Sequence, residues 1–339
     1  MLVAVGETSG DRLAASIVRE LSSSRAVEAR GVVGPDGRTA GIEPIADLEG
    51  LHAVGLADGV RSAAAALRRI RRLHDEARRW HPHVFLTVDA PSFTLRAARR
   101  VRSVGTPVVH VGAPQVWAWR AGRRRRLGAS VDELLCLLPF EPDWFAGHLP
   151  ATYVGHPATA LTPHPRAQQP TLALLPGSRP GEVRRLWPVL RQVARHVASR
   201  RPDVRFVVVQ APGVRLSGLE AHLVASVEQA ASAWAAVAAS GTVTLELAAL
   251  AVPQVVVYRT DPLTYAAGRR WLTVSHLALP NLVAGEAVVP EVVQQLCPDD
   301  LAIRALRALD GPRPAPLDLG GDRAVRRMAE AVGDWLPTV

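Results

Sequence analysis

A short segment near the start of the chain combines two glycines with acidic and hydroxyl side chains, Gly6-Glu7-Thr8-Ser9-Gly10-Asp11. The two glycines, Gly6 and Gly10, permit tight turning and let a ligand approach the backbone closely. Glu7 and Ser9 would offer that ligand a carboxylate and a hydroxyl. A helix start capped by Ser9 or Asp11 explains the same residues equally well.

A second carboxylate, Asp89, directly follows the apolar run from Val84 to Val88 and precedes Pro91. A carboxylate next to a buried strand is partly desolvated, which raises its pKa and favours general-base chemistry. The alternative is that this position caps a helix beginning near Ser92.

Two segments in the second half of the chain have the residue types that bind phosphate. In Leu175-Pro176-Gly177-Ser178-Arg179, a glycine, a guanidinium and the free N–H groups of a helix start suit a diphosphate. In Ser240-Gly241-Thr242, hydroxyl and backbone N–H groups suit phosphate as well. Glu246 follows on an otherwise apolar helix, where a carboxylate needs a reason to be, and it can accept hydrogen bonds from a ribose diol.

Other chemistries lack their motifs. No Gly-x-Gly-x-x-Gly follows a strand, and no Walker motif exists because the chain has no Lys, which disfavours hydride transfer and ATP hydrolysis. Cys136 and Cys297 lack metal-ligand spacing, so we expect neither a zinc site nor a disulfide framework, and no cofactor. The scattered histidines indicate surface or packing positions, and these are His52, His110, His156 and His276.

The elements that must hold these segments alternate between short aliphatic runs and longer helical patterns. Strands are predicted at 2–5, 84–88, 107–111, 171–175, 204–210, 235–239 and 254–258, and helices at 11–21, 92–102, 181–199, from 240 to 251, and 321–336. This alternation is typical of an α/β fold with parallel sheets wrapped by helices. The linker-like composition of residues 154–169 divides the chain into domains 1–160 and 161–320, with 321–339 closing as a helix that packs back on the first domain.

Charge and hydropathy limit the partners. The 339 residues carry a formal charge of +9, and all 40 basic residues are Arg, so nucleic acid, anionic lipid and phosphorylated substrates all qualify. The apolar stretch 231–258 is interrupted by Gly, Glu and Pro, which favours a buried core over a membrane span. The absence of a signal-peptide pattern at residues 1–5 indicates a cytoplasmic protein.

The order of these motifs resembles that of the lipid-A-disaccharide synthase family, over nearly the whole chain. In the first half the matching segments are Gly6 to Asp11, Val88 to Phe93, the aromatic block Val116-Trp117-Ala118-Trp119-Arg120, Leu138 to Glu141 and Gly155-His156-Pro157. In the second half they are Leu174 to Arg179 with Glu182, Ser240 to Glu246, Tyr258-Arg259, Leu279 to Leu282, Ala284-Gly285 and Pro290-Glu291. One departure is Gly37, which stands where the family usually carries Met.

The resemblance implies two Rossmann-like domains facing each other across a cleft, the GT-B arrangement, and an inverting transferase that needs no metal. Its substrates would be UDP-2,3-diacylglucosamine and 2,3-diacylglucosamine 1-phosphate, joined by a β-1,6 linkage with release of UDP. By similarity Asp89 is the base and Glu7 a nearby carboxylate. Ser178, Arg179 and Asn281 would hold the diphosphate and Glu246 the ribose.

The family also implies a peripheral protein on the inner face of the bacterial inner membrane, and it leaves a homodimer open. Residues 61–80 predict a helix with Leu67, Ile70, Leu73, Ala77 and Trp80 on one face and many Arg elsewhere, which suits an anionic lipid surface. A helix that simply covers the sheet explains the same pattern. Arg120 and Arg123 to Arg126 form a second basic cluster.

Two other functions remain open on the sequence. One is a transferase or epimerase that acts on another UDP-amino sugar. The other is a non-catalytic protein on a decayed transferase scaffold that binds anionic lipid or nucleic acid, although the acidic and basic residues kept at the motif positions argue against decay.

Overall fold

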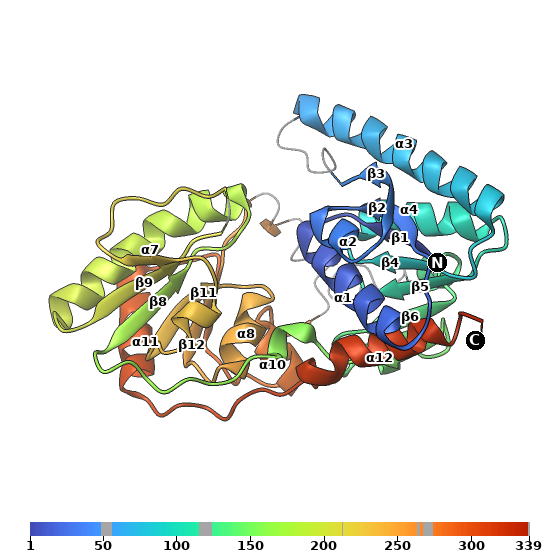
Figure 1. Cartoon of the computed structure of the whole chain (residues 1–339). Helices are drawn as coiled ribbons and strands as arrows, with labels where there is room; N and C mark the ends of the chain where they lie inside the picture. Colours follow the sequence, from blue (N-terminus) through green and yellow to red (C-terminus); the bar gives the residue numbers. More distant parts are fainter. Residues whose placement is uncertain (49–55, 115–123, 212, 263–264, 267–273, 338–339) are drawn as a thin grey trace. The chain divides into compact units, whose positions relative to one another are not determined.

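The computed structural model describes residues 1–48, 56–114, 124–211, 213–262, 265–266 and 274–337. The chain forms two compact units (Figure 1). Unit 1 comprises Met1–Pro157 together with Asp322–Val339, and unit 2 comprises Ala158–Gly321. Each unit is built on its own parallel β-sheet.

Unit 1 has a seven-stranded sheet in the order β3-β2-β1-β4-β5-β6-β7. Its strands are β1 (Leu2–Val5), β2 (Arg30–Val33), β3 (Glu43–Asp47), β4 (Phe85–Val88), β5 (Val108–Val111), β6 (Glu133–Cys136) and β7 (Ala151–Tyr153). Its helices are α1 (Thr8–Ser24), α2 (Pro35–Thr39), α3 (Leu56–Trp80), α4 (Pro91–Arg102), α5 (Arg124–Gly128), α6 (Glu141–Phe145) and α12 (Gly321–Gly333), and a 3-10 turn, Pro157–Thr159, follows β7.

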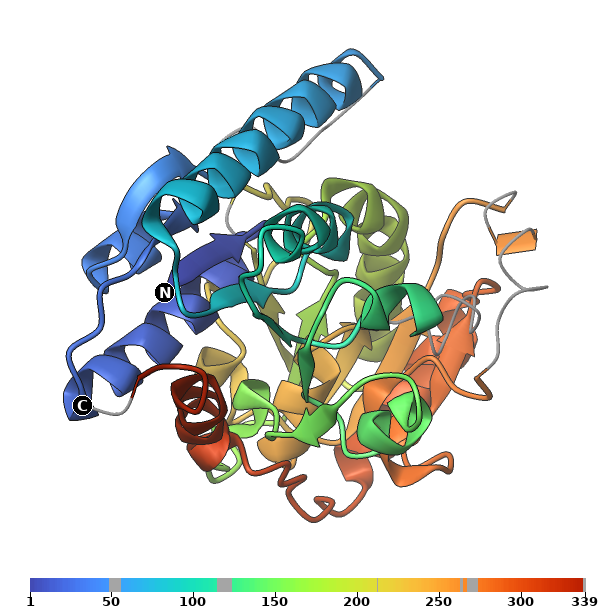
Figure 2. The same ribbon diagram turned by 90° about the vertical axis from the view of Figure 1, so that its right-hand side faces the viewer.

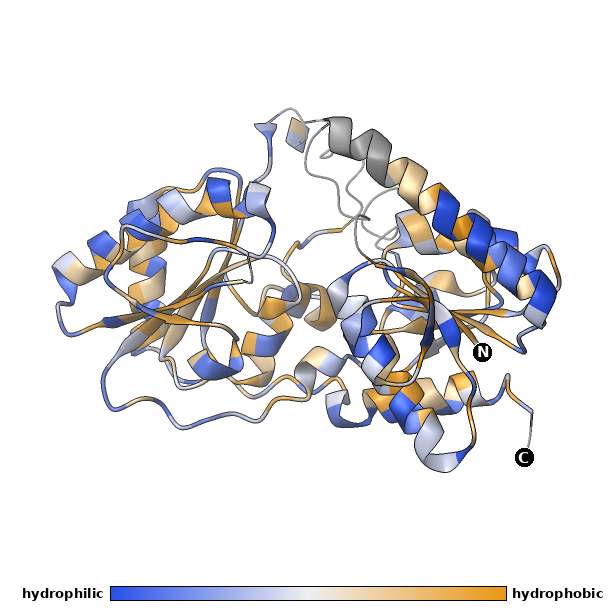
Figure 3. Ribbon diagram, turned by 45° about the horizontal axis from the view of Figure 1, so that its top comes forward, coloured by the Kyte–Doolittle hydropathy of each residue, from blue (hydrophilic) through white to orange (hydrophobic). Residues whose placement is uncertain are grey.

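The central strands β1, β4 and β5 are buried on both faces, which is why they are mainly hydrophobic. In β1, Leu2 and Ala4 join the core beneath α3 and α4, whereas Val3 and Val5 join the core beneath α1 and α12. Figure 2 shows α3 and α4 together on one side of the sheet. The strands are mostly hydrophobic and the helices carry their hydrophilic residues outward (Figure 3).

The last helix, α12, belongs to unit 1. Ala324, Met328 and Val332 are wholly buried in the same core as α1. Two hydrogen bonds fix its end: Arg25 donates to the Gly333 carbonyl at 2.9 Å, and the Trp335 indole donates to a Glu133 carboxylate oxygen at 2.8 Å.

Unit 2 has a six-stranded sheet in the order β10-β9-β8-β11-β12-β13. Its strands are β8 (Thr171–Leu175), β9 (Arg205–Val209), β10 (His222–Val224), β11 (Ala235–Ala239), β12 (Gln254–Tyr258) and β13 (Glu291–Val293). Its helices are α7 (Pro180–Arg200), α8 (Val243–Ala249), α10 (Leu279–Ala284) and α11 (Pro298–Asp310), with a 3-10 turn at Glu228–Ala230.

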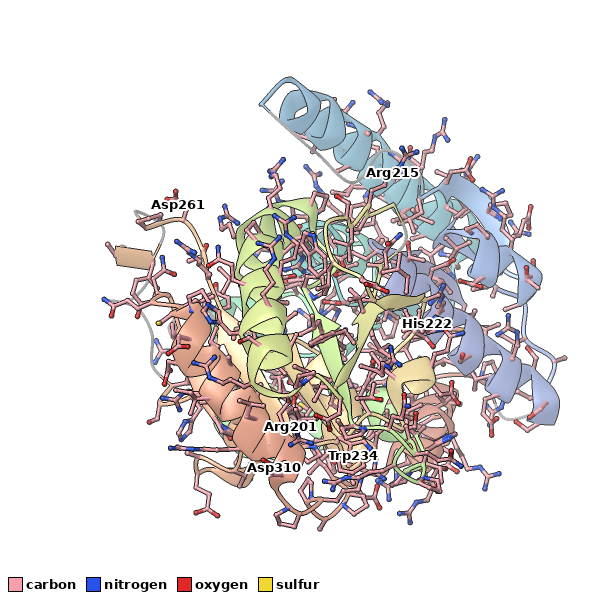
Figure 4. The ribbon with its side chains drawn as sticks, turned by 90° about the vertical axis from the view of Figure 1, so that its left-hand side faces the viewer. Arg201, Arg215, His222, Trp234, Asp261 and Asp310 are labelled. Atoms are coloured by element: carbon pink, nitrogen blue, oxygen red, sulfur yellow. The ribbon has the colours of Figure 1, made fainter. Side chains whose placement is uncertain are left out.

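Helices α7 and α11 cover one face of this sheet, and α8 lies on the other. Polar contacts join the elements at the amino ends of the strands. Figure 4 shows Arg201 at the end of α7 near Asp310 at the end of α11, and their side chains form an ion pair of 2.9 Å. The Trp234 indole, labelled in the same figure, donates to the Ala167 carbonyl at 2.8 Å and so ties the chain before β8 to the sheet.

Asp11 is a wholly buried carboxylate that holds the loop after β2. It accepts hydrogen bonds from the backbone N–H groups of Gly34, Asp36 and Gly37, at 2.8, 3.0 and 3.3 Å. The interpretation of Asp11 as a cap of its own helix is therefore wrong, because it caps α2 instead. A side chain at Gly37 would require this loop to shift, since a Cβ would lie 2.8 Å from Asp11 Oδ1 and 2.7 Å from Val33 Cβ.

Glu141 and Glu291 hold loops in the same way. Glu141 is buried and accepts from the N–H groups of Leu137 and Leu138, at 3.1 and 3.0 Å, directly after β6. Glu291, on β13, accepts from the N–H groups of Leu277 and Ala278, at 3.0 and 2.7 Å, where α10 begins. A negative charge near the N-terminus of a helix also interacts favourably with the helix dipole.

The predicted elements agree closely with the observed ones. The strands at 2–5, 171–175, 235–239 and 254–258 match to the residue. The helices predicted at 11–21, 92–102 and 181–199 are observed as α1, α4 and α7, which are one to three residues longer at one or both ends. On α3, Ile70, Leu73 and Ala77 are buried in the core with the sheet residues, as the covering alternative predicts, whereas Leu67 is 52% exposed. Among the described helices, none is long and apolar enough to cross a bilayer.

Candidate active site

In unit 1 the two predicted carboxylates follow neighbouring strands. β1 and β4 pair in parallel with Val5 opposite Val88, so Glu7 and Asp89 emerge at the same edge of the sheet. The strand order reverses between β1 and β4, because β2 and β3 lie on one side and β5 to β7 on the other. Ligands of open α/β sheets bind at such a switch point, at the carboxyl ends of the strands.

The loops that carry these carboxylates are in close contact. A Cβ added at Gly6 would lie 2.3 Å from Ala90 Cβ, so only glycine fits at this position. Asp89 and Ala90 both adopt the left-handed conformation, with φ of 48° and 45°. This conformation is strained in residues that carry a Cβ, and such strain is concentrated at functional sites.

Among the residues that the structure describes, the carboxylates of Glu7 and Asp89 have no hydrogen-bond or ion-pair partner. Glu7 is half-buried, and Asp89 is exposed. The prediction that Asp89 is partly desolvated is therefore wrong, since it lies just beyond the buried strand. Neither carboxylate makes a structural contact in the described part of the chain, so both are available to bind a substrate.

The capping alternatives do not hold at either helix. Glu7 is the N-cap of α1 and Ala90 the N-cap of α4, and neither helix receives a side-chain cap. Ser9 is exposed on the first turn of α1. Gly10 is buried, and a Cβ there would lie 3.3 Å from the Val88 carbonyl oxygen, so Gly10 lets α1 pack closely on β4.

Unit 2 repeats this arrangement. β8 and β11 pair in parallel with Leu175 opposite Ala238, and the strand order reverses between them. The segment Pro176 to Arg179 and the segment Ser240 to Thr242 thus leave the sheet side by side. Both groups of predicted phosphate-binding residues lie at the switch point of their own sheet.

The turn before α7 presents Ser178 and Arg179 to solvent, and within the described residues neither side chain has a hydrogen-bond or ion-pair partner. Gly177 shapes the turn with φ of 98°. The Glu182 carboxylate lies directly over this glycine: a Cβ added at Gly177 would be 2.0 Å from Glu182 Oε2. Burial raises the pKa of Glu182, and the nearby Arg179 guanidinium opposes that shift.

The second segment combines a fixed residue with an open one. Ser240 donates its hydroxyl to the Leu277 carbonyl at 2.8 Å, which leaves only its lone pairs for a ligand. A Cβ added at Gly241 would meet nothing within 4 Å, so the backbone there is open to close approach. Thr242 is the exposed N-cap of α8.

Glu246 is a half-buried carboxylate on α8, among Leu245, Leu247 and other apolar residues. In the described part of the chain it has no hydrogen-bond or ion-pair partner. Burial raises its pKa above the ordinary value of 4.5. The fold thus keeps an uncompensated carboxylate, as expected for a group whose partner is a ligand.

Asn281 does not fit the predicted role in diphosphate binding. It is wholly buried, it donates to the Val289 carbonyl at 2.9 Å, and it accepts from the Val289 N–H at 2.8 Å. Its second contact is with Glu291 Oε2 at 3.4 Å. The side chain is occupied in joining α10 to the loop before β13, so it positions backbone instead of contacting a ligand.

The histidines have structural surroundings. His110 is wholly buried and contacts Thr87 Oγ1 through Nδ1 at 2.8 Å, and burial lowers its pKa to about 4. Burial likewise lowers the pKa of His156 to about 4, and His276 lies 3.4 Å from Glu291. His52, the aromatic block at 116–120 and Arg123 lie outside the described residues.

The family model described as lipid-A-disaccharide synthetase matches residues 1–309. The chain belongs to the lipid-A-disaccharide synthase family. It is 40% identical to the lipid-A-disaccharide synthase of Alkalilimnicola ehrlichii, over 92% of this chain and 90% of that protein. It is 36% identical to the lipid-A-disaccharide synthase of Myxococcus xanthus, over 99% of this chain and 97% of that protein.

Solved structures share the fold. The glycosyltransferase of kitacinnamycin matches with a TM-score of 0.65 at 17% identity, over 99% of this chain and 98% of that one. The UDP-GlcNAc 2-epimerase of Neisseria meningitidis, solved with UDP-GlcNAc, matches with a TM-score of 0.62 at 13% identity, over 98% and 99%. The predicted GT-B class, with two parallel α/β sheets, is confirmed.

The raised pKa of Glu246 predicts a pH-dependent stability. Because the folded pKa lies above the unfolded one, the charged carboxylate destabilises the fold, and stability falls as pH rises from 4.5 through the folded pKa. We expect Glu246→Gln to raise the thermal midpoint at pH 7.5 by about 2–4 °C, the shift that ~1 kcal/mol gives in a domain of this size.

Circular dichroism at several pH values measures this midpoint. The gain should shrink as the pH falls below 4.5, because Glu246 becomes protonated in both the folded and the unfolded state. Glu228→Gln is the matched control, because Glu228 is an exposed carboxylate of the same unit and its replacement should leave the midpoint unchanged. An equal gain at all pH values would contradict the account.

Proposed function

We propose that this chain transfers the 2,3-diacylglucosamine unit of a UDP donor to 2,3-diacylglucosamine 1-phosphate, giving the β-1,6-linked disaccharide 1-phosphate and UDP. The observation that carries the proposal is the match to lipid-A-disaccharide synthases along nearly the whole chain. That match favours this transferase over an epimerase or a transferase for another UDP-amino sugar. The exposed, unpartnered side chains at the two switch points argue against a decayed, non-catalytic scaffold.

The chemistry requires a proton acceptor and a stabilised leaving group. An acceptor hydroxyl oxygen attacks the anomeric carbon of the donor, and the bond from that carbon to the UDP oxygen breaks. Asp89 takes the proton from the attacking hydroxyl, and its exposure without a partner supports this role. Glu7, from the neighbouring strand end, contributes a second negative charge that helps orient the acceptor.

Unit 2 supplies the groups for the departing UDP. The free guanidinium of Arg179 and the hydroxyl of Ser178 stabilise the diphosphate as its charge develops. The open backbone at Gly241 and the hydroxyls of its neighbours Ser240 and Thr242 allow close contact with phosphate oxygens. Glu246 accepts hydrogen bonds from the ribose hydroxyls, which offsets the cost of its burial.

Substitution of the base and of the cationic anchor tests this assignment. Asp89→Asn should lower kcat about 100-fold or more with little change in KM, because general-base catalysis contributes roughly this factor. Arg179→Ala should lower kcat about 100-fold through the loss of leaving-group stabilisation. UDP release is measured with the acylated donor, with and without the acylated acceptor.

The controls are Asp143→Asn and Arg215→Ala, exposed residues of unit 1 and unit 2 that should leave the rate unchanged. UDP release that does not depend on the acceptor, or sugar interconversion without release, would refute the transferase. Full activity of Asp89→Asn would refute the base assignment alone and leave Glu7 as the candidate.

We propose further that unit 1 binds an anionic membrane surface through α3 and α4, which pack against each other. Seven exposed arginines on these helices have no ion-pair partner in the described part of the chain, and they are Arg68, Arg71, Arg72, Arg78, Arg96, Arg99 and Arg100. Leu67 is exposed beside two of them. This combination favours contact with anionic headgroups and shallow apolar insertion.

Vesicle sedimentation tests the membrane surface. Arg68→Glu/Arg71→Glu should lower partitioning onto phosphatidylglycerol vesicles about tenfold or more, since each basic residue near the surface contributes about 1 kcal/mol. Arg215→Glu/Arg307→Glu in unit 2 changes the net charge equally and should have little effect. Equal losses for the two variants, or no binding of the parent protein at low salt, would contradict the proposal.

A further inference from the structure

The backbone of Asp89 and Ala90 is held in a conformation that these residues do not favour. Both have φ near +45°, and the next residue is Pro91, the first residue of α4. Aspartate tolerates this left-handed region better than most residues, but alanine does not. Surrounding contacts must therefore hold the turn, since an unsupported chain would relax to another conformation.

The main-chain groups of Asp89 are fixed on both sides. Its N–H donates to the Val111 carbonyl at 2.9 Å, which continues the pairing of β4 with β5. Its carbonyl accepts a hydrogen bond from the Thr94 hydroxyl at 2.5 Å. With N–H and C=O both held, the direction in which the Asp89 side chain leaves the backbone is set.

The Thr94 bond is not the ordinary one for threonine in a helix. Helical threonine commonly donates to the carbonyl four residues earlier, and Thr94 makes that contact with Ala90 at 3.1 Å. Its shorter contact reaches five residues back, to Asp89, which precedes the N-cap of α4. The Thr94 side chain is wholly buried, so water does not compete for the hydroxyl.

Gly6 limits the turn from the side of β1. A side chain at Gly6 would overlap Ala90, so the loop that carries Glu7 and the turn that carries Asp89 pack with no intervening space. The turn is thus held between Gly6, Val111 and Thr94, while the Asp89 carboxylate stays exposed.

We infer that Thr94 is a positioning residue, whose hydroxyl holds the strained Asp89-Ala90 turn so that the Asp89 carboxylate meets the acceptor hydroxyl in the geometry for proton transfer. This inference rests on the proposed function, in which Asp89 is the base. Thr94 itself contacts no substrate and acts only through the backbone of Asp89.

The test is a double-mutant cycle in the transferase assay. Thr94→Val keeps the shape of the side chain and removes the hydroxyl, so kcat should fall about 10- to 100-fold, the cost of misplacing a catalytic group by roughly 1 Å. KM for the UDP donor should stay within about twofold, because the donor's phosphate groups lie with unit 2 residues in the proposed function. Thr94→Ser restores the hydroxyl and should recover most of the rate.

In the Asp89→Asn background, Thr94→Val should add little further loss, since the base through which it acts is already absent. Thr39→Val is the matched control, because Thr39 donates to the carbonyl four residues earlier, at 2.9 Å in α2, and does not reach Asp89. Thermal unfolding of each variant verifies that the fold is retained.

Three outcomes separate the claims. A Thr94→Val enzyme within twofold of the parent, or one that Thr94→Ser does not rescue, would overturn the inference. An equal fold-loss from Thr94→Val in the parent and in Asp89→Asn would also overturn it, because the hydroxyl would then act on the fold in general. Full activity of Asp89→Asn would instead reject the base assignment of the proposed function.

Discussion

The structure depends on carboxylates that accept hydrogen bonds from backbone N–H groups of loops next to the strand ends. Asp11 holds the loop after β2, Glu141 the turn after β6, and Glu291 the start of α10. Each bond is charge-assisted, and loss of the acceptor would leave buried N–H groups without partners. Because these carboxylates hold the loops, the motif residues next to the loops have fixed positions. Their own side chains need make no structural contact.

The motif residues therefore divide by their surroundings. Asp11 and Asn281 are buried and fully used in holding backbone. Glu7, Asp89 and Glu246 have no hydrogen-bond or ion-pair partner among the described residues. Two of them lower the stability of the fold, Glu246 through its half-buried charge and Asp89 through its left-handed backbone. Local features that lower stability without any structural gain are expected where a ligand completes the interaction.

Much of this was predictable from the sequence. The strands at 171–175 and 235–239 are buried on both faces, so their sequences are aliphatic and their ends were predicted to the residue. The glycine and hydroxyl residues that follow strands indicated the positions of both switch points. The roles of individual side chains were less predictable. The sequence suggests Asp11 as a cap of its own helix, but the N–H groups that donate to it lie 23 to 26 residues further along the chain. The exposure of Asp89 and Leu67 and the burial of Asn281 likewise depend on tertiary packing that no local pattern encodes.

The central claim is that the carboxylates bonded to backbone N–H groups hold the loops, and that the carboxylates without a partner carry the chemistry. The most direct measurement compares Asp11→Asn with Glu7→Gln, neighbours on one motif, by thermal unfolding and by transferase rate. The account predicts that Asp11→Asn lowers the thermal midpoint by several degrees, since three N–H groups lose a charged acceptor, about 1–3 kcal/mol. Glu7→Gln should keep the midpoint and lose about tenfold or more in rate. A stable Asp11→Asn protein, or a Glu7→Gln protein that unfolds early but retains full specific activity while folded, would contradict it.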